Sequence, residues 1–191
     1  CTAQVAEGLV VTTNSEKVRN ARRNILDMLL SNHKTDCFSC PSNGDCKLQE
    51  LCFEYGIERT TYSGEQTELP IDDSNKFFTY NPNLCILCHR CVNTCHKIVG
   101  RGAIDTMERG FDSAIGTPFH VDWIDTTCES CGNCVQACPT GALTMKRRKN
   151  YREWEVKKVR TTCPHCATGC QMDLYVKDGK IVDVQGADGP S

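Results

Sequence analysis

The sequence is poor in the residues that build an ordinary hydrophobic core. Of its 191 residues, 39% are hydrophobic and 7% are aromatic. No stretch approaches the roughly 18 consecutive apolar residues that a membrane span needs, and no charged segment followed by an apolar one marks a signal peptide. The net charge of -2 gives no basic field that would attract nucleic acid. We therefore expect a soluble cytoplasmic protein that neither inserts into membranes nor binds nucleic acid.

Nucleotide-binding and hydrolytic motifs are missing as well. The sequence has no Walker loop, no dinucleotide-binding glycine fingerprint and no Ser-His-Asp arrangement, so it predicts neither catalytic residues nor a nucleotide site. The basic run Lys146–Lys149 is interpreted as a solvated linker or a subunit contact. The start at Cys1 and the end at Ser191 suggest a piece of a longer protein.

Cysteine, in contrast, is abundant. The chain has 16 cysteines, a density typical of chains held together by covalent or metal cross-links. Their local spacing distinguishes the two, because disulfide frameworks belong to oxidising compartments, whereas closely spaced C-x2-C pairs in an intracellular chain indicate metal ligands. The cysteines are therefore predicted to bind metal.

The ferredoxin run C-x2-C-x2-C-x3-C occurs twice. In this run three thiolates surround one [4Fe-4S] cluster, and the fourth points to a second cluster, so two runs exchange one ligand each. The first predicted ligand set is Cys85, Cys88, Cys91 and Cys138, and the second is Cys128, Cys131, Cys134 and Cys95. The alternative is a zinc-stapled interaction module, since C-x2-C pairs also bind zinc, but the third thiol of each run has no place in a zinc ribbon.

A second type of site precedes this pair. His33, Cys37, Cys40 and Cys46 follow a predicted helix that begins with a capping box at Thr13 and Glu16 and ends near Ser31. Its expected apolar face consists of Val18, Ala21, Ile25, Met28 and Leu29. One imidazole and three thiolates suit zinc or an iron-sulfur cluster, and the neighbouring ferredoxin runs favour [4Fe-4S]. The alternative role for His33 is that of a cation at the helix end.

A third site is incomplete. Cys163, Cys166 and Cys170 supply three ligands, and we expect a fourth cysteine beyond Ser191. The residues that follow predict a β-hairpin with a type I′ turn at Asp178-Gly179. Cys52 is expected to be a small buried hydrophobic residue, and from its surroundings alone Cys1 would be one too.

Taken together, these motifs resemble the N-terminal iron-sulfur region of the catalytic subunit of NAD(P)-linked molybdenum or tungsten formate dehydrogenases. The matching stretches are Cys1–Val5, His33–Cys40, Gly44–Gln49 and Cys163–Cys170 with Asp178–Val182. The resemblance implies that Cys1 is a [2Fe-2S] ligand. It also implies a missing downstream domain that carries a Mo- or W-bis-pterin centre. The large peripheral-arm subunit of respiratory complex I is the main alternative, but its relatives usually lack the complete second ferredoxin run.

The resemblance implies an α+β chain made of small cluster-stapled modules. The expected parts are the end of a plant-type [2Fe-2S] domain at 1–14, a [4Fe-4S] segment at 15–62, a linker at 63–76, a two-[4Fe-4S] ferredoxin domain at 77–147, a linker at 148–160, and the start of a molybdopterin oxidoreductase domain at 161–191. The implied function is an electron relay within an oxidoreductase, from a formate-oxidising centre to partner subunits that carry iron-sulfur clusters, flavin and NAD(P). A complex I-like, hydrogenase or transhydrogenase complex is the alternative assembly.

Overall fold

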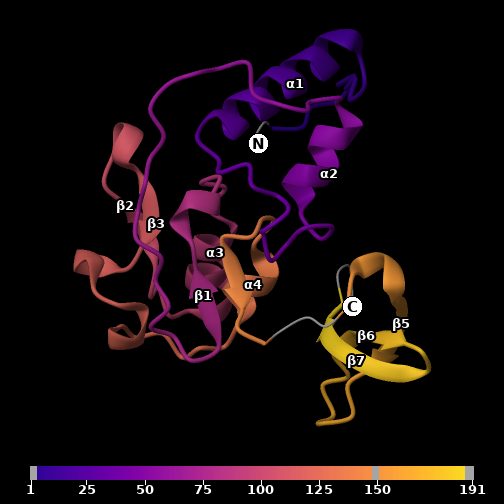
Figure 1. The fold of residues 1–191 in the computed structure, drawn as a ribbon. Coiled ribbons are helices and arrows are strands. Elements are labelled where there is room, and N and C mark those ends of the chain that lie inside the picture. Colours follow the sequence, from indigo (N-terminus) through magenta and orange to yellow (C-terminus); the bar gives the residue numbers. More distant parts are fainter. Residues whose placement is uncertain (1–3, 148–150, 188–191) are drawn as a thin grey trace.

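The structure is a computed structural model that describes residues 4–147 and 151–187, and it mixes short helices with small antiparallel sheets (Figure 1). The α+β prediction is therefore confirmed. Two helices pack together, a central body holds the ferredoxin runs, and a three-stranded sheet follows at the C-terminal end (Figure 1). None of the described helices is long and apolar enough to cross a membrane.

The first helix, α1, runs over Glu16–Ser31 and packs on α2, Lys47–Glu54. Its N-cap is Ser15, whose side chain accepts a hydrogen bond from the Val18 N–H at 3.3 Å. The predicted capping box at Thr13 and Glu16 is therefore wrong, because Ser15 directly precedes the helix and takes the capping role. The predicted helix end at Ser31 is confirmed.

The buried face of α1 differs from the predicted one. Leu26 and Leu30 are buried and form a small core with Leu48 and Cys52, whereas Ile25 and Met28 are about half exposed. The sequence offers apolar residues on both sides of this stripe, and the position of α2 decides which of them are covered. The prediction that Cys52 is a buried hydrophobic residue is confirmed.

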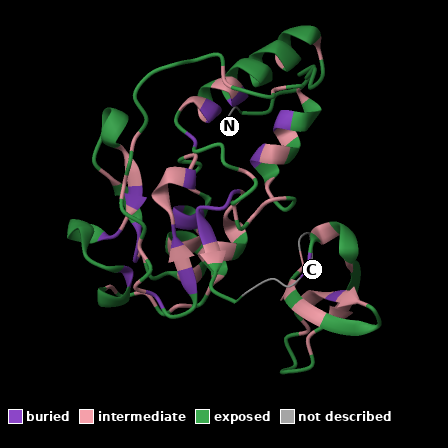
Figure 2. Cartoon of the chain, viewed as in Figure 1, coloured by how far each residue is buried: buried purple, intermediate pink, exposed green. Residues whose placement is uncertain are grey.

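The central body is built on two strands from opposite ends of the ferredoxin segment. Strand β1, Phe78–Tyr80, pairs antiparallel with β4, Leu143–Met145. Between them lie α3, Arg90–Asn93, and α4, Asn133–Ala137. Trp123 is 2% exposed, and its ring packs edge-on against the rings of Phe78 and Tyr80, with centroids 5.3 and 5.1 Å away. This aromatic group is part of the main core, which Figure 2 shows as the largest buried area.

The segment between the two ferredoxin runs folds into short elements. A π-helical stretch, Thr94–Val99, extends α3, and β2, Asp105–Met107, forms an antiparallel pair with β3, Ala114–Gly116. Single 3-10 turns complete the central body and the approach to the last sheet: Pro82–Leu84, Gly110–Asp112, Pro118–His120, Trp123–Asp125 and Glu153–Glu155.

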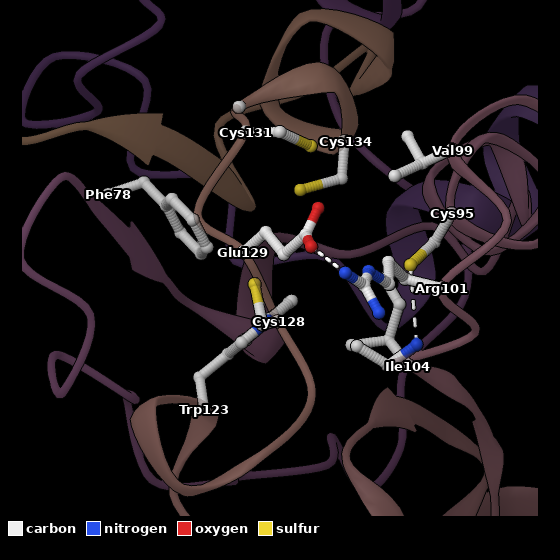
Figure 3. Close-up of a pocket in the computed structure, with 12 residues that line it drawn as sticks. Phe78, Cys95, Val99, Arg101, Ile104, Trp123, Cys128, Glu129, Cys131 and Cys134 are labelled. Atoms are coloured by element: carbon white, nitrogen blue, oxygen red, sulfur yellow. Dashed lines mark hydrogen bonds and ion pairs between the residues drawn. The ribbon is translucent and has the colours of Figure 1, made fainter.

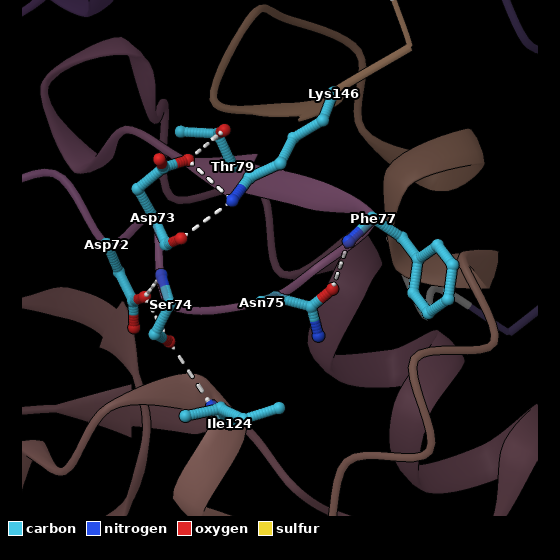
Figure 4. Close-up of polar contacts among 8 residues, drawn as sticks. All are labelled: Asp72, Asp73, Ser74, Asn75, Phe77, Thr79, Ile124 and Lys146. Atoms are coloured by element: carbon cyan, nitrogen blue, oxygen red, sulfur yellow. Dashed lines mark hydrogen bonds and ion pairs between the residues drawn. The ribbon is translucent and has the colours of Figure 1, made fainter.

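The polar connection predicted at 63–76 is fastened to the central body at its C-terminal end (Figure 4). The Asp72 carboxylate accepts hydrogen bonds from the Ser74 and Trp123 N–H groups, both at 2.9 Å. Lys146 donates to the Asp73 carbonyl at 2.7 Å and forms an ion pair with its carboxylate at 3.0 Å. Asn75 is 1% exposed and donates to Ser130 in the second ferredoxin run at 2.8 Å.

The C-terminal sheet has the strand order β5-β6-β7, with β5 at Lys157–Thr162, β6 at Gln171–Lys177 and β7 at Lys180–Gly186. The predicted β6–β7 hairpin is confirmed, and its turn residues Asp178 and Gly179 have φ angles of 52° and 73°, as a type I′ turn requires. Strand β5 was missed. It begins inside the segment expected to be a linker at 148–160. The sequence does not predict this strand, because its charged, largely exposed residues lack the alternation that marks a half-buried strand.

Candidate metal centres

Two cavities in the central body are each lined by four cysteines. One contains Cys95, Cys128, Cys131 and Cys134 in its lining (Figure 3), and the other contains Cys85, Cys88, Cys91 and Cys138. Each cavity thus receives three thiols from one ferredoxin run and the last thiol of the other run. These sets coincide with the ligand sets that the sequence predicts, while metal ligation itself stays a prediction.

The backbone turns in the same way at equivalent positions of the two runs. Leu87 and Ser130, each between the first and second thiols of a C-x2-C pair, have φ angles of 51° and 56°. This left-handed conformation is unfavourable for a residue other than glycine and is often found at functional sites. Here it directs the Leu87 N–H to Cys85 Sγ and the Ser130 N–H to Cys128 Sγ, both at 3.4 Å. The runs therefore present N–H donors to sulfur, and such hydrogen bonds help to set the reduction potential of an iron-sulfur cluster.

Several of the cavity thiols are buried or half-buried, whereas Cys88 and Cys131 are exposed. Burial raises the pKa of Cys85 to about 11 and that of Cys91 and Cys134 to about 12, and the neighbouring thiols contribute to each shift. Because a buried thiolate is unfavourable without a counter-charge, these groups are protonated as free thiols at neutral pH. A bound metal would displace the protons and neutralise the thiolates.

The donor set fits an iron-sulfur cluster. Four thiols line each of the two hollows, together with largely apolar neighbours. Within 4–147 and 151–187, no three or more His, Cys, Asp or Glu side chains converge as they would around a single ion. Four thiols around a hollow are the ligand set of a [4Fe-4S] cluster.

An ion pair that the sequence did not predict lies at the Cys95–Cys134 cavity. The Arg101 guanidinium pairs with the carboxylate of Glu129, the residue after Cys128, and both side chains line the cavity (Figure 3). The Ala103 N–H donates to Cys95 Sγ at 3.3 Å. Arg101 and Glu129 lie 28 residues apart in sequence, so no local pattern could have paired them.

The predicted site near α1 and α2 has three neighbouring thiols. Burial raises the pKa of Cys37, Cys40 and Cys46, and the charge of another thiol of the group adds to the effect in each case. His33 is 7% exposed, and its Nδ1 has no hydrogen-bond partner within the described part of the chain. Burial lowers its pKa, which keeps the imidazole neutral, and this is the form that binds iron. A buried neutral imidazole with an unpaired nitrogen fits the predicted role of His33 as a ligand.

The third predicted site lies in the connection between β5 and β6. Cys163 and Cys170 are joined there by a backbone hydrogen bond from N–H to carbonyl of 2.8 Å, and Cys166 lies between them at the exposed tip. Hydrogen bonding with the side chain and backbone of Thr168 lowers the pKa of Cys166. The expectation of a fourth ligand beyond Ser191 stays a prediction, and Cys1 lies outside the described residues.

Three consecutive parts of the chain match family models. Residues 22–61 match the iron-sulfur binding region of NADH-ubiquinone oxidoreductase-G, and residues 76–144 match the ferredoxin-like domain of NADH-quinone oxidoreductase subunit 3. Residues 156–190 match the Fe4S4 domain of molybdopterin oxidoreductases. Each matched part contains one of the cysteine groups described above. The chain therefore consists of iron-sulfur binding modules, including [4Fe-4S] modules.

Whole proteins with these modules are similar along nearly the full chain. An NADH-quinone oxidoreductase subunit of Rhizobium meliloti is 37% identical over 97% of this chain, and the alpha subunit of the NADPH-Fe(3+) oxidoreductase of Geobacter sulfurreducens is 39% identical over 98%. This chain spans 22% of the length of either relative. A protein of Staphylococcus aureus, provisionally named a formate dehydrogenase, is 28% identical over 97% of this chain and 23% of its own length.

A solved structure is similar in both fold and sequence. A crystal structure of NAD+-reducing [NiFe]-hydrogenase in the H2-reduced state matches with a TM-score of 0.65 and 30% identity, over 70% of this chain and 57% of the other. The sequence and structure comparisons thus agree that much of this chain is similar to parts of redox proteins.

Proposed function

Since this chain is an iron-sulfur region like that of the NADH-quinone oxidoreductases, we propose that it is an electron relay within an NAD(P)-linked oxidoreductase complex. The observation that carries the proposal is the pair of four-thiol cavities, each completed by a thiol from the other ferredoxin run. When bound, a [4Fe-4S] cluster accepts and releases one electron at a time. The residues of this chain supply binding, spacing and the surrounding charge.

In this proposal four groups of residues bind [4Fe-4S] clusters. The ferredoxin cavities hold one cluster each, and the imidazole of His33 acts with three thiolates at the site beside α1 and α2. The full proposed ligand sets are Cys85, Cys88, Cys91 and Cys138; Cys128, Cys131, Cys134 and Cys95; His33, Cys37, Cys40 and Cys46; and Cys163, Cys166 and Cys170 with a fourth cysteine elsewhere. Cys1 is proposed as one ligand of a [2Fe-2S] cluster.

Groups around the two cavities would affect the charge and the solvent exposure of the clusters. Backbone N–H groups of Leu87 and Ser130 donate to sulfur and offset part of the negative charge of the thiolates. The aromatic core at Trp123 keeps water from one side of the Cys95–Cys134 cavity. These features keep the ligand geometry similar in both oxidation states, so an electron can arrive and leave with little rearrangement.

We further propose that the relay serves a molybdenum or tungsten formate dehydrogenase, with flavin- and NAD(P)-binding partner subunits. The match of residues 156–190 to the molybdopterin oxidoreductase Fe4S4 domain supports this assignment, as does the relative from Staphylococcus aureus. Electrons would pass from the Cys163 site to the ferredoxin pair and on to the His33 site. A complex I-like or hydrogenase assembly is the second candidate, favoured by the names of the Rhizobium meliloti relative and the hydrogenase structure.

The relay proposal can be tested by removing one buried ligand in the whole protein. Cys134→Ala should abolish the NAD(P)-linked reaction and leave artificial-dye reduction at the catalytic centre partly intact, because only the path between the two is cut. Cys52→Ala is the matched control, since it also removes a buried thiol but none of the proposed ligands. Equal loss of both activities in Cys134→Ala, with Cys52→Ala normal, would argue against a relay.

A further inference from the structure

The segment after Cys138 and the loop before α2 touch at two points. The Lys47 N–H donates a hydrogen bond of 2.9 Å to the Pro139 carbonyl, and the Cys40 side chain packs against the backbone of Gly141. Cys138 precedes Pro139 and lines one ferredoxin cavity, while Cys46 precedes Lys47 and belongs to the three-thiol group beside α2. The contact therefore joins two proposed ligand sets through one hydrogen bond.

Gly141 is fixed in place on both sides. Thr140 is 4% exposed and donates to the Leu84 carbonyl at 2.8 Å, and the Asn81 N–H donates to the Ala142 carbonyl at 2.7 Å. A Cβ at position 141 would lie 2.7 Å from Cys40 Sγ and 3.4 Å from Ser42 Oγ. Carbon atoms pack at roughly 3.5–4.0 Å, so the Cys40 side chain, or the loop that carries it, would have to shift. The φ angle of Gly141 lies outside the left-handed region, so the obstacle to alanine there is the contact and not the backbone.

We propose that Gly141 and the Lys47 N–H are positioning residues that set the separation between the ligand set of His33, Cys37, Cys40 and Cys46 and that of Cys85, Cys88, Cys91 and Cys138. This inference rests on the proposed relay function. One electron passes between the two sites, so one site is oxidised as the other is reduced. No bond is formed or broken, and no proton is transferred.

Two substitutions should disrupt this contact between the segment after Cys138 and the loop before α2 without replacing a proposed ligand. Gly141→Ala adds the obstructing methyl group, and Gly64→Ala is its control, because a Cβ at position 64 meets open space and its φ is also outside the left-handed region. Lys47→Pro removes the hydrogen-bond donor at the first residue of α2, where proline is tolerated, and the extended backbone of Cys46 suits a following proline. Lys47→Ala removes the same side chain but keeps the N–H.

The measurement uses the whole protein with all its clusters, and it has two readouts besides turnover. Electron paramagnetic resonance of the reduced protein should show both cluster signals in every variant. The magnetic coupling between the two clusters should weaken in Gly141→Ala and Lys47→Pro only. Pyridine-nucleotide-linked turnover should fall in the same two variants, while Gly64→Ala and Lys47→Ala follow the wild type.

The outcomes distinguish the inference from the relay proposal. If iron and sulfide are absent even from the wild type, the relay proposal fails. If clusters are present but the coupling in Gly141→Ala and Lys47→Pro equals that in their controls, the positioning role is refuted while the relay stands. Should Gly141→Ala lose its clusters through misfolding, the two Lys47 variants decide the question by themselves.

Discussion

Exchange of ligands between the two ferredoxin runs predicts an unequal effect of two double substitutions. Cys88→Ala combined with Cys138→Ala removes two thiols from one cavity, whereas Cys88→Ala combined with Cys95→Ala removes one thiol from each cavity. Cys88 is exposed, so its replacement leaves no hole in the core. Both double variants lose the same number of thiols, and they differ only in how the losses are shared.

The expected magnitude follows from the lining of the cavities. In the first double variant only one cluster is lost, about four iron atoms with an equal amount of sulfide. In the second, both clusters of the pair lose a ligand, and up to about eight iron atoms become labile. The first pair of substitutions should therefore be non-additive, because the second loss falls on a cluster that is already gone, while the second pair should be additive.

The assay is iron and acid-labile sulfide per chain after anaerobic purification, together with the spin count of the reduced protein. The first double variant should keep one cluster of the pair with its normal signal, and the second should keep neither intact. Cys52→Ala should match the wild type. The reverse ranking would mean that each run binds its own cluster with its own four cysteines, and the crossed arrangement would be refuted.

Three further predictions concern single residues. His33→Cys should keep the cluster but lower its reduction potential, because a thiolate adds negative charge, and His33→Ala should make the cluster labile. A redox titration in which both variants behave like the wild type would remove His33 from the ligand set. Arg101→Gln should lower the reduction potential of the cluster at Cys95–Cys134 and Glu129→Gln should raise it, because reduction adds negative charge beside this ion pair. Shifts of the same sign in the two variants would refute the assignment of a cluster to this cavity. Burial raises the pKa of Asp183, but hydrogen bonds from Tyr151 and other donors outweigh this, and the folded pKa lies below its ordinary value. The stabilisation that the ionised Asp183 gives to the folded state should be complete above about pH 4 and should disappear as the pH falls through the lowered pKa. Asp183→Asn should therefore make the melting temperature depend less steeply on pH on the acid side. An unchanged pH dependence would contradict this prediction.

The sequence predicted well where function depends on local spacing. The two C-x2-C-x2-C runs are short, and their backbone turns fix where three thiols point, so the four-thiol grouping could be anticipated from sequence alone. The hairpin at Asp178-Gly179 was predictable for the same reason, because its turn chemistry is contained in two residues. In both motifs a few neighbouring residues determine the local backbone geometry, and the tertiary structure keeps that geometry.

Features that depend on distant packing could not be predicted. The buried face of α1 is chosen by α2, and β5 is a strand because β6 supplies its hydrogen bonds, not because of its own pattern. The Lys47–Pro139 hydrogen bond joins residues far apart in sequence through backbone atoms that any residue except proline could provide on the donor side. Gly141 carried no local signal either, since its constraint is the position of the Cys40 thiol.

The central claim, that the cysteines hold iron-sulfur clusters for electron transfer, is tested most directly by metal analysis of anaerobically purified protein. The account predicts a brown protein with iron and acid-labile sulfide in near-equal amounts, several iron atoms per chain, and a visible absorbance that bleaches on reduction. A colourless protein that contains only zinc would contradict it and would support a zinc-stapled interaction module in its place.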